Sequence, residues 1–151
     1  MKLMVTLTSH KPEETSALGE SWGRKARSGW LIGLSGDLGA GKTLLAGGIA
    51  RGLGVAGRTQ SPTFQIVNQY LGGRLPLFHI DLYRLSTRND VVAAGLETIL
   101  SRPTGVTVVE WIERWIGKDI PLLLPGVRFR RVEISISGEE ERRIDYEDFG
   151  N

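Results

Sequence analysis

The spacing of apolar residues along the chain switches between a strand pattern and a helical one, which predicts an α/β fold. Two short runs, residues 30–35 and 106–110, are mostly apolar, and β-branched residues dominate the second. Such runs are typical of buried parallel strands, because both faces of these strands are covered. We therefore expect a central sheet built around them, with a first strand over residues 1–7.

Three segments carry apolar residues at helical spacing and predict helices that pack on the sheet. The first starts near Pro12, where Ser9 or a neighbour is expected to act as the cap. The second contains Gly47 and Gly48, which each destabilise a helix by about 1 kcal/mol relative to alanine, so close packing against a neighbour is expected. The third covers residues 90–100. The apolar stripes are Leu18, Trp22 and Ala26; Leu45, Ile49 and Leu53; and Val92, Leu96, Ile99 and Leu100.

Two glycine-containing turns predict antiparallel hairpins beside the parallel strands. Gly72 and Gly73 separate the strand-like residues 64–70 and 75–83. A second hairpin is expected at the C-terminus, over residues 132–146. The predicted sheet is therefore mixed and mostly parallel, flanked by helices, with a C-terminal β-hairpin.

Composition limits the other possibilities. The length of 151 residues suits one domain, so we interpret residues 1–151 as a single unit. The chain has no cysteine, which excludes disulfides, a disulfide-linked partner and a thiolate nucleophile. No apolar run approaches the ~18 residues that span a bilayer, so we expect no membrane segment and a cytoplasmic protein.

A phosphate-binding loop of the pattern G-x-x-x-x-G-K-[ST], the P-loop, lies between the strand at residues 30–35 and the second helix. The loop consists of Gly36, Asp37, Leu38, Gly39, Ala40, Gly41, Lys42 and Thr43. Its backbone N–H groups can bind a polyphosphate, Lys42 adds positive charge, and the Thr43 hydroxyl can ligate Mg²⁺. The fold is thus predicted to be P-loop NTPase-like. Lys118 and Asp119 lack the spacing of a guanine-binding signature, so ATP is the expected nucleotide.

Hydrolysis or phosphoryl transfer also requires a carboxylate near Mg²⁺ and a group that positions the attacking oxygen. Asp81 and Glu110 are the acids at the ends of apolar strands. Asp81 could bind Mg²⁺ directly or through water, or could pair with Arg84. Glu110 could accept a proton from water or complete the shell around the metal, or could form a cap or salt bridge. Trp111 could cover the site or simply pack.

Two further polar residues leave choices open. Thr63 follows Pro62 in a loop where P-loop proteins often sense the γ-phosphate, although a simple turn is the alternative. His79 has the same strand parity as Asp81, and we interpret it as a hydrogen-bonded strand histidine rather than as a ligand or base.

Four motifs, in this order, resemble the TsaE family (also called YjeE), small bacterial P-loop ATPases of tRNA threonylcarbamoyladenosine (t6A) synthesis. They are GDLGAGKT at residues 36–43, SPTF at 61–64, HIDLYR at 79–84 and VEW at 109–111. The resemblance implies an Mg²⁺-dependent ATPase, weak alone, that supports the TsaB–TsaD complex. That complex transfers threonylcarbamoyl to tRNA, so contact with tRNA is expected to be indirect.

The resemblance also implies residue roles. Lys42 and Thr43 would bind phosphate and Mg²⁺, Thr63 would belong to a switch loop, Asp81 would lie in the Mg²⁺ shell, Glu110 would be needed for hydrolysis, and Trp111 would lie beside the nucleotide. The chain departs from the family pattern at three positions. Leu44 is expected at the nucleotide but offers no hydroxyl to the α-phosphate, Gly47 replaces a common arginine, and Ile112 replaces a common proline.

Two other functions stay open at this point. A small-molecule kinase would need an acceptor pocket and an arginine-bearing lid, for which the chain has no obvious insertion. A non-catalytic, nucleotide-gated assembly factor would be consistent with Leu44 and Gly47 as signs of a weakened site.

Overall fold

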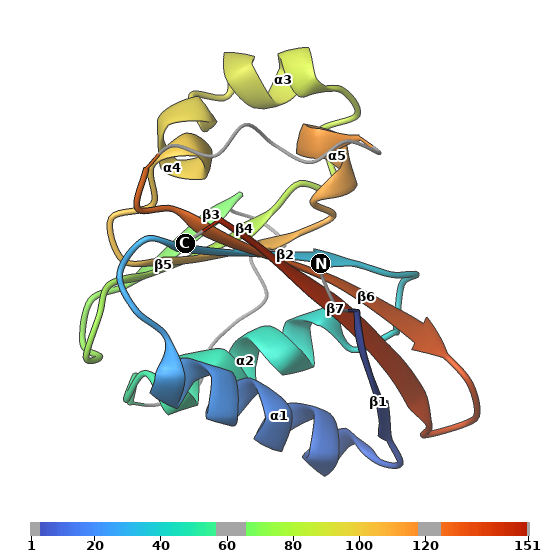
Figure 1. Cartoon of the computed structure of the whole chain (residues 1–151). Coiled ribbons are helices and arrows are strands. Elements are labelled where there is room, and N and C mark those ends of the chain that lie inside the picture. The colour runs from blue at the N-terminus through green and yellow to red at the C-terminus, as the bar shows by residue number, and fades with distance from the viewer. Residues whose placement is uncertain (1–3, 57–65, 118–124, 151) are drawn as a thin grey trace.

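A seven-stranded sheet with helices on both faces forms the body of the molecule (Figure 1). The computed structural model describes residues 4–56, 66–117 and 125–150. The strands are β1 (Val5–Ser9), β2 (Trp30–Ser35), β3 (Val67–Tyr70), β4 (Leu77–Asp81), β5 (Val106–Glu110), β6 (Arg128–Ile136) and β7 (Arg142–Gly150). The helices are α1 (Pro12–Lys25), α2 (Lys42–Gly52), α3 (Arg88–Ala93), α4 (Glu97–Ser101) and α5 (Glu113–Ile116).

The strand order β1-β7-β6-β2-β5-β4-β3 places parallel strands at the centre and antiparallel strands at the edges. β2 pairs in parallel with β5 and β6, and β4 pairs in parallel with β5. β3 and β4 form the first predicted hairpin, while β6 and β7 form the C-terminal one. The mixed α/β architecture is therefore confirmed. The sequence did not indicate that β1 pairs with β7.

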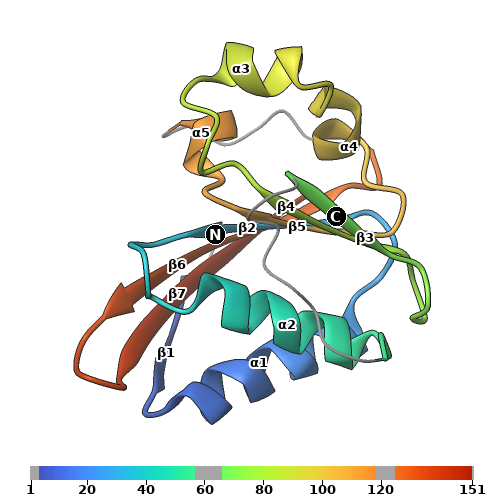
Figure 2. The ribbon, with the colours of Figure 1, turned by 180° about the vertical axis from the view of Figure 1, so that it is seen from behind.

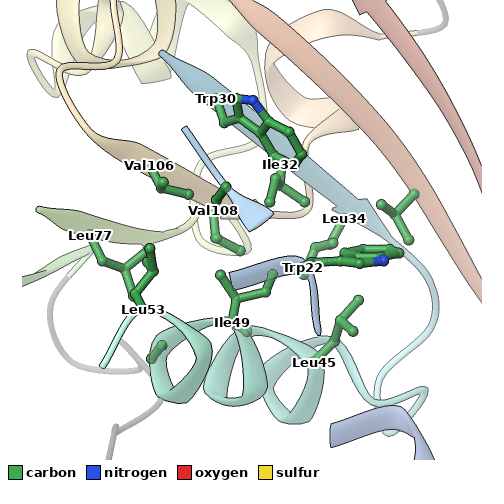
Figure 3. Close-up of a cluster of buried hydrophobic side chains, with 14 of the residues drawn as sticks. Trp22, Trp30, Ile32, Leu34, Leu45, Ile49, Leu53, Leu77, Val106 and Val108 are labelled. Carbon is green, nitrogen blue, oxygen red and sulfur yellow. The ribbon is translucent and has the colours of Figure 1, made fainter. Parts of the chain in front are cut away.

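Each face of the sheet carries its own apolar core. α1 and α2 cover one face, and α3, α4 and α5 cover the other (Figures 1 and 2). The first core joins the buried side chains of α1 and α2 to those of β2, β4 and β5, as Figure 3 shows for Trp22, Leu45 and Val108. The second core contains Ile80 and Val109. Alternate residues of each central strand therefore contact different helices, as expected for a sheet covered on both sides.

Glycines in α1 and α2 let the two helix backbones touch. A Cβ atom at Gly48 would lie 2.2 Å from the carbonyl oxygen of Ser16, and one at Gly19 would lie 2.3 Å from that of Leu45. No side chain fits at such distances, so the helices can pack this closely only with glycine at these positions. The close packing expected for Gly48 is confirmed, and it fixes α2 beneath the sheet.

The helices differ from the prediction in two places. A single helix was expected over residues 90–100, but the structure has two short helices, α3 and α4, on either side of Gly95. Gly95 has a φ of 81°, a left-handed conformation that terminates α3. Val91 is buried in place of Val92, which is 42% exposed. The N-cap of α1 is Lys11, without a side-chain cap; the Ser9 hydroxyl donates to the Lys11 carbonyl and accepts from the Thr15 hydroxyl.

The first strand begins at Val5, and the residues before Met4 lie outside the described part of the chain. Across the described residues, no helix combines the length and apolar character needed to cross a membrane.

Candidate functional site

The P-loop turns at the carboxyl end of β2 and leads directly into α2. Gly36, Gly39 and Gly41 have φ angles of 149°, 81° and 111°, values that residues with a Cβ rarely adopt. No side chain caps α2, and the N–H groups of Lys42, Thr43 and Leu44 have no acceptor within the described residues. Unpaired N–H groups at a helix N-terminus are a ready site for an anion.

A pocket of about 380 Å³ opens beside this loop, within the range of small-molecule sites. Three adjacent parallel strands, β2, β5 and β4, end at the edge of the sheet where it lies. Its lining consists of Leu38, Gly39, Gly41, Lys42, Thr43, Leu44, Asp81, Tyr83, Glu110 and Trp111. Most of the residues predicted to bind nucleotide or metal are thus brought together. The predicted residues Gly36, Asp37 and Ala40 belong to the loop but do not line the pocket.

The Lys42 ammonium is buried among loop carbonyls. Nζ donates to the carbonyl oxygens of Gly36 and, at 2.8 Å, Asp37, and it lies 4.4 Å from the centre of the Trp111 ring. Burial lowers the pKa of Lys42, and the nearby acids, with Glu110 the strongest, counteract part of this shift. Lys42 is therefore a desolvated cation at the edge of the pocket.

Glu110 is the buried acid at the centre of the site. The Thr43 hydroxyl donates to its two carboxylate oxygens at 3.0 and 3.1 Å, and His79 Nε2 lies 2.6 Å from Oε2. α2, β4 and β5 each supply one of these three residues. His79 is a hydrogen-bonded strand histidine, as we interpreted it, but the sequence did not identify Glu110 as its partner.

Asp81 lies next to Glu110 in the register of β4 and β5. Its Oδ1 accepts a hydrogen bond from the Tyr83 backbone N–H at 2.9 Å. Among the described residues no cation forms an ion pair with it, so the alternative of a salt bridge with Arg84 is not observed. Burial, followed by the charge of Glu110, raises the pKa of Asp81 despite opposing contributions from the Tyr83 N–H, His79 and Lys42.

Aromatic and aliphatic side chains border the polar centre. Trp111 has a φ of 62°, the one positive value outside glycine in the described part of the chain, and its ring centre lies 5.1 Å from that of Tyr83. Both residues line the pocket, so Trp111 covers the site as well as packing against the second core. Leu38 is 67% exposed and Leu44 is 37% exposed at the same opening.

The donor atoms in the pocket suit Mg²⁺ better than a softer metal. Thr43, Asp81 and Glu110 offer a hydroxyl and two carboxylates, and Mg²⁺ prefers oxygen ligands. Within the described residues, no group of three or more His, Cys, Asp or Glu could hold a metal alone. A Mg²⁺ ion here would need further oxygens from phosphate and water, which is how Mg²⁺ is usually held beside a nucleotide.

One predicted residue lies outside the described part of the chain, and two residues at the site were not indicated by the sequence. Thr63 and its loop lie outside the described residues, so its predicted role is untested. The sequence reading missed Tyr83 as a pocket residue, although it has the same parity as His79 and Asp81. It also missed Arg142, whose guanidinium donates to the P-loop carbonyls of Gly39 and Ala40 from 102 or more residues away. No local pattern marks that contact.

Comparisons with known proteins identify a family to which this chain is similar. The family model described as threonylcarbamoyl adenosine biosynthesis protein TsaE matches residues 9–144. The tRNA threonylcarbamoyladenosine biosynthesis protein TsaE of Bacillus subtilis is 39% identical over 140 residues, which cover 93% of this chain and 83% of that protein. The protein of the same name from Synechocystis sp. is 46% identical over 101 residues, which cover 63% of this chain and 64% of that protein.

A solved structure shows the same fold. The crystal structure of Bacillus subtilis YdiB superposes with a TM-score of 0.78 at 32% identity, covering 100% of this chain and 89% of that chain. Sequence and fold similarity therefore both extend over most of the chain.

Proposed function

Since the chain belongs to the TsaE family of t6A biosynthesis proteins, we propose that it serves this modification as a Mg²⁺-dependent ATPase. We place this activity in the cytoplasm, with TsaB and TsaD as its protein partners and tRNA reached through their complex. One observation carries the proposal: Asp81 and Glu110, from separate strands, line one pocket with Lys42 and Thr43 of the P-loop.

Phosphate binding would use the P-loop backbone and Lys42. The free N–H groups at the start of α2 present partial positive charge to the phosphates. Lys42 Nζ would exchange the carbonyls of Gly36 and Asp37 for phosphate oxygens. The exchange is favourable because an ammonium interacts more strongly with an anion than with neutral carbonyls.

Hydrolysis would depend on Glu110. A carboxylate fixed by the Thr43 hydroxyl and by His79 is oriented before substrate binds, and it can accept a proton from an attacking water. Thr43 and Asp81 would hold Mg²⁺, with Glu110 beside them. When bound, the ion would neutralise charge that develops on the phosphate oxygens. Thr63, to which the family resemblance gives a switch-loop role, would respond to the γ-phosphate.

The composition of the pocket supports weak turnover without partners. Lys42 is the only cationic side chain among the described lining residues. Phosphoryl transfer is commonly accelerated by a second cation, often an arginine supplied by another protein, by about 10³-fold or more. Docking of TsaB and TsaD could supply this missing charge or order the site.

The test is phosphate release from ATP by the purified chain, with and without TsaB, TsaD and tRNA. We expect slow Mg²⁺-dependent release alone and faster release with the partners. Lys42→Ala should abolish ATP binding, because it removes the charge that compensates the phosphates. Tight ATP binding without phosphate release, even with all partners present, would favour the nucleotide-gated assembly factor. Release that requires an added metabolite instead would favour a kinase.

A further inference from the structure

We propose that Arg142, at the start of β7, is a positioning residue that holds the P-loop in its phosphate-binding shape. Its Nε donates to the carbonyl oxygen of Ala40 at 3.1 Å, and Nη2 donates to that of Gly39 at 3.3 Å. The inference rests on the proposed ATP binding and names a residue that this binding depends on.

The two carbonyls fix the orientation of two successive peptide units. In a trans peptide the C=O and N–H groups point in opposite directions, and the described chain has no cis peptide. With the Ala40 carbonyl held by Arg142, the N–H of Gly41 points away from Arg142, and it has no acceptor among the described residues. Gly41 lines the pocket, so this N–H is a candidate phosphate donor.

The second peptide unit closes the loop on itself. While the Gly39 carbonyl accepts from Arg142, the N–H of the same unit, which belongs to Ala40, donates to the Asp37 carbonyl at 3.1 Å. Glycines at positions 39 and 41 give this segment wide conformational freedom, which an external contact can restrict. Arg142 thus supplies a restraint that the loop lacks on its own.

The charge of Arg142 is available to the loop. Its other hydrogen bonds go to the carbonyls of Gly138, Glu139 and Glu141 in the β6–β7 turn. Within the described residues it forms no ion pair with a carboxylate. Its positive charge therefore lies beside the loop without a direct ion pair among the described residues, and it would add to the attraction of a polyphosphate.

The neighbouring side chains provide matched controls. Arg143 points to the other side of β7, is exposed, and pairs with Asp145 at 3.1 Å. Ser137 donates to Glu141 Oε1 within the same turn at 3.1 Å, and among the described residues it forms no hydrogen bond with the P-loop. A variant at Ser137 weakens the turn alone, whereas a variant at Arg142 weakens both the turn and the loop.

The experiment measures the Kd of the full chain for Mg-ATP and for inorganic tripolyphosphate by calorimetry. Arg142→Ala should raise both Kd values by about tenfold, the loss expected for hydrogen bonds made by a charged donor. The tripolyphosphate arm shows that the effect acts on phosphates rather than on adenine. With TsaB and TsaD present, KM for ATP should rise while kcat changes by less than about twofold.

Arg142→Lys should restore part of the affinity, since it keeps the charge and an N–H donor group but lacks the planar guanidinium that reaches both carbonyls. Arg143→Ala and Ser137→Ala should bind both ligands like the parent. The inference is wrong if Arg142→Ala binds ATP like the parent, or if Ser137→Ala weakens binding equally. If the parent itself binds no ATP, the proposed function fails as well, whereas equal binding by parent and variant leaves that function intact.

Discussion

Two regions of the molecule bury charged side chains, and they differ in whether these charges are paired with opposite charges of the protein. In the first, which we call the Arg–Asp cluster, Asp148 accepts hydrogen bonds from Arg128 at 2.6 Å and from Arg130 at 2.7 and 2.8 Å. The guanidinium of Arg130 lies 4.7 Å from the ring centre of Trp22 and 4.4 Å from that of Tyr146. Every charge in this cluster therefore has a partner inside the fold.

The pocket beside the P-loop is different. Asp81 and Glu110 lie next to each other with no arginine between them, and Lys42 donates to neutral carbonyls. The pKa values reflect this contrast. Burial alone would raise the pKa of Asp148, but the hydrogen bonds from Arg130 and Arg128 outweigh it and hold that pKa below its usual value. Burial raises the pKa of Asp81, and no comparable partner reverses the shift.

The difference distinguishes charged side chains that stabilise the fold, as in the Arg–Asp cluster, from charged side chains that are available to bind a ligand, as in the pocket. A partly buried acid with two arginine donors has its charge compensated without any ligand. A partly buried acid beside another acid does not, and its charged form becomes favourable when a cation binds nearby. Sites for ligands commonly carry this kind of local instability, which the rest of the fold offsets.

Among the substitutions proposed for the two regions, Glu110→Gln should have the largest effect, and it should act on ATP hydrolysis. The amide keeps the size of the side chain but cannot accept a proton from water. We expect partner-stimulated ATP hydrolysis to fall by about 100-fold or more, while the Kd for ATP changes by less than about threefold. Single-turnover phosphate release and calorimetry measure the two quantities.

Glu113→Gln is the matched control for this prediction. Glu113 accepts from the Ser35 hydroxyl at 3.2 Å beside the site but does not line the pocket. Its hydrolysis rate should stay close to that of the parent. Unchanged hydrolysis in Glu110→Gln would remove Glu110 from the proposed chemistry.

The next largest effect is expected in the Arg–Asp cluster. Asp148→Asn leaves Arg130, which is 8% exposed, without its carboxylate. The free energy of unfolding should fall by about 2 kcal/mol, less than for a fully buried pair because the Asp148 side chain is 29% exposed. Urea unfolding measures this, and ATP binding should not change.

Glu20→Gln is the control for Asp148→Asn, since it breaks the exposed pair with Arg24 on α1. Exposed pairs of this kind contribute about 0.5 kcal/mol or less. A loss in Asp148→Asn as small as that in Glu20→Gln would show that the cluster does not stabilise the fold.

Asp81→Asn should produce a smaller effect of the opposite sign. Removing a carboxylate whose charged form is disfavoured should raise the unfolding free energy of the ligand-free protein, by about 0.5 kcal/mol after solvent screening. The same variant should lose the extra thermal stability that Mg-ATP gives the parent. Melting curves with and without Mg-ATP measure both effects.

For this third prediction, Asp37, an exposed P-loop residue that does not line the pocket, provides a control, and Asp37→Asn should leave ligand-free stability unchanged. If Asp81→Asn were less stable than the parent, the Asp81 carboxylate would stabilise the ligand-free fold, which would contradict its proposed role as a cation-binding group.

Much of the site was predictable because its signals are local or repeat along the chain. The glycines and Lys42 of the P-loop are contiguous in sequence. Asp81 and Glu110 each end an apolar strand, and parallel strands bring their carboxyl ends to one edge. Their proximity therefore follows from the sequence pattern.

The remaining features depend on contacts that no local pattern encodes. The apolar spacing over residues 90–100 continues through Gly95, so it does not reveal the break between α3 and α4. The pairing of His79 with Glu110 requires the register of β4 against β5. The contact of Arg142 with Ala40 depends on a hairpin folding back 102 residues later.

The smallest expected effect is the pH dependence of stability, which has opposite signs in the two regions. Asp148 has a folded pKa below its unfolded value of about 3.9, so its contribution is complete above that pH and is lost as the pH falls through the folded pKa. Asp81 has a folded pKa above its unfolded value, so the folded state binds its proton more tightly. Stability therefore rises as the pH falls through the raised pKa towards about 3.9.

Unfolding free energies of the parent, Asp148→Asn and Asp81→Asn, measured between pH 3 and pH 7, separate the two contributions. The advantage of the parent over Asp148→Asn should be constant near neutral pH and shrink below about pH 4. The deficit of the parent relative to Asp81→Asn should instead be largest near neutral pH and disappear in acid. Because both comparisons use the same parent, acid effects elsewhere in the chain cancel, and only these two carboxyl groups remain. Two curves with the same sign would contradict the distinction between a paired acid in the Arg–Asp cluster and an acid reserved for a cation at the P-loop.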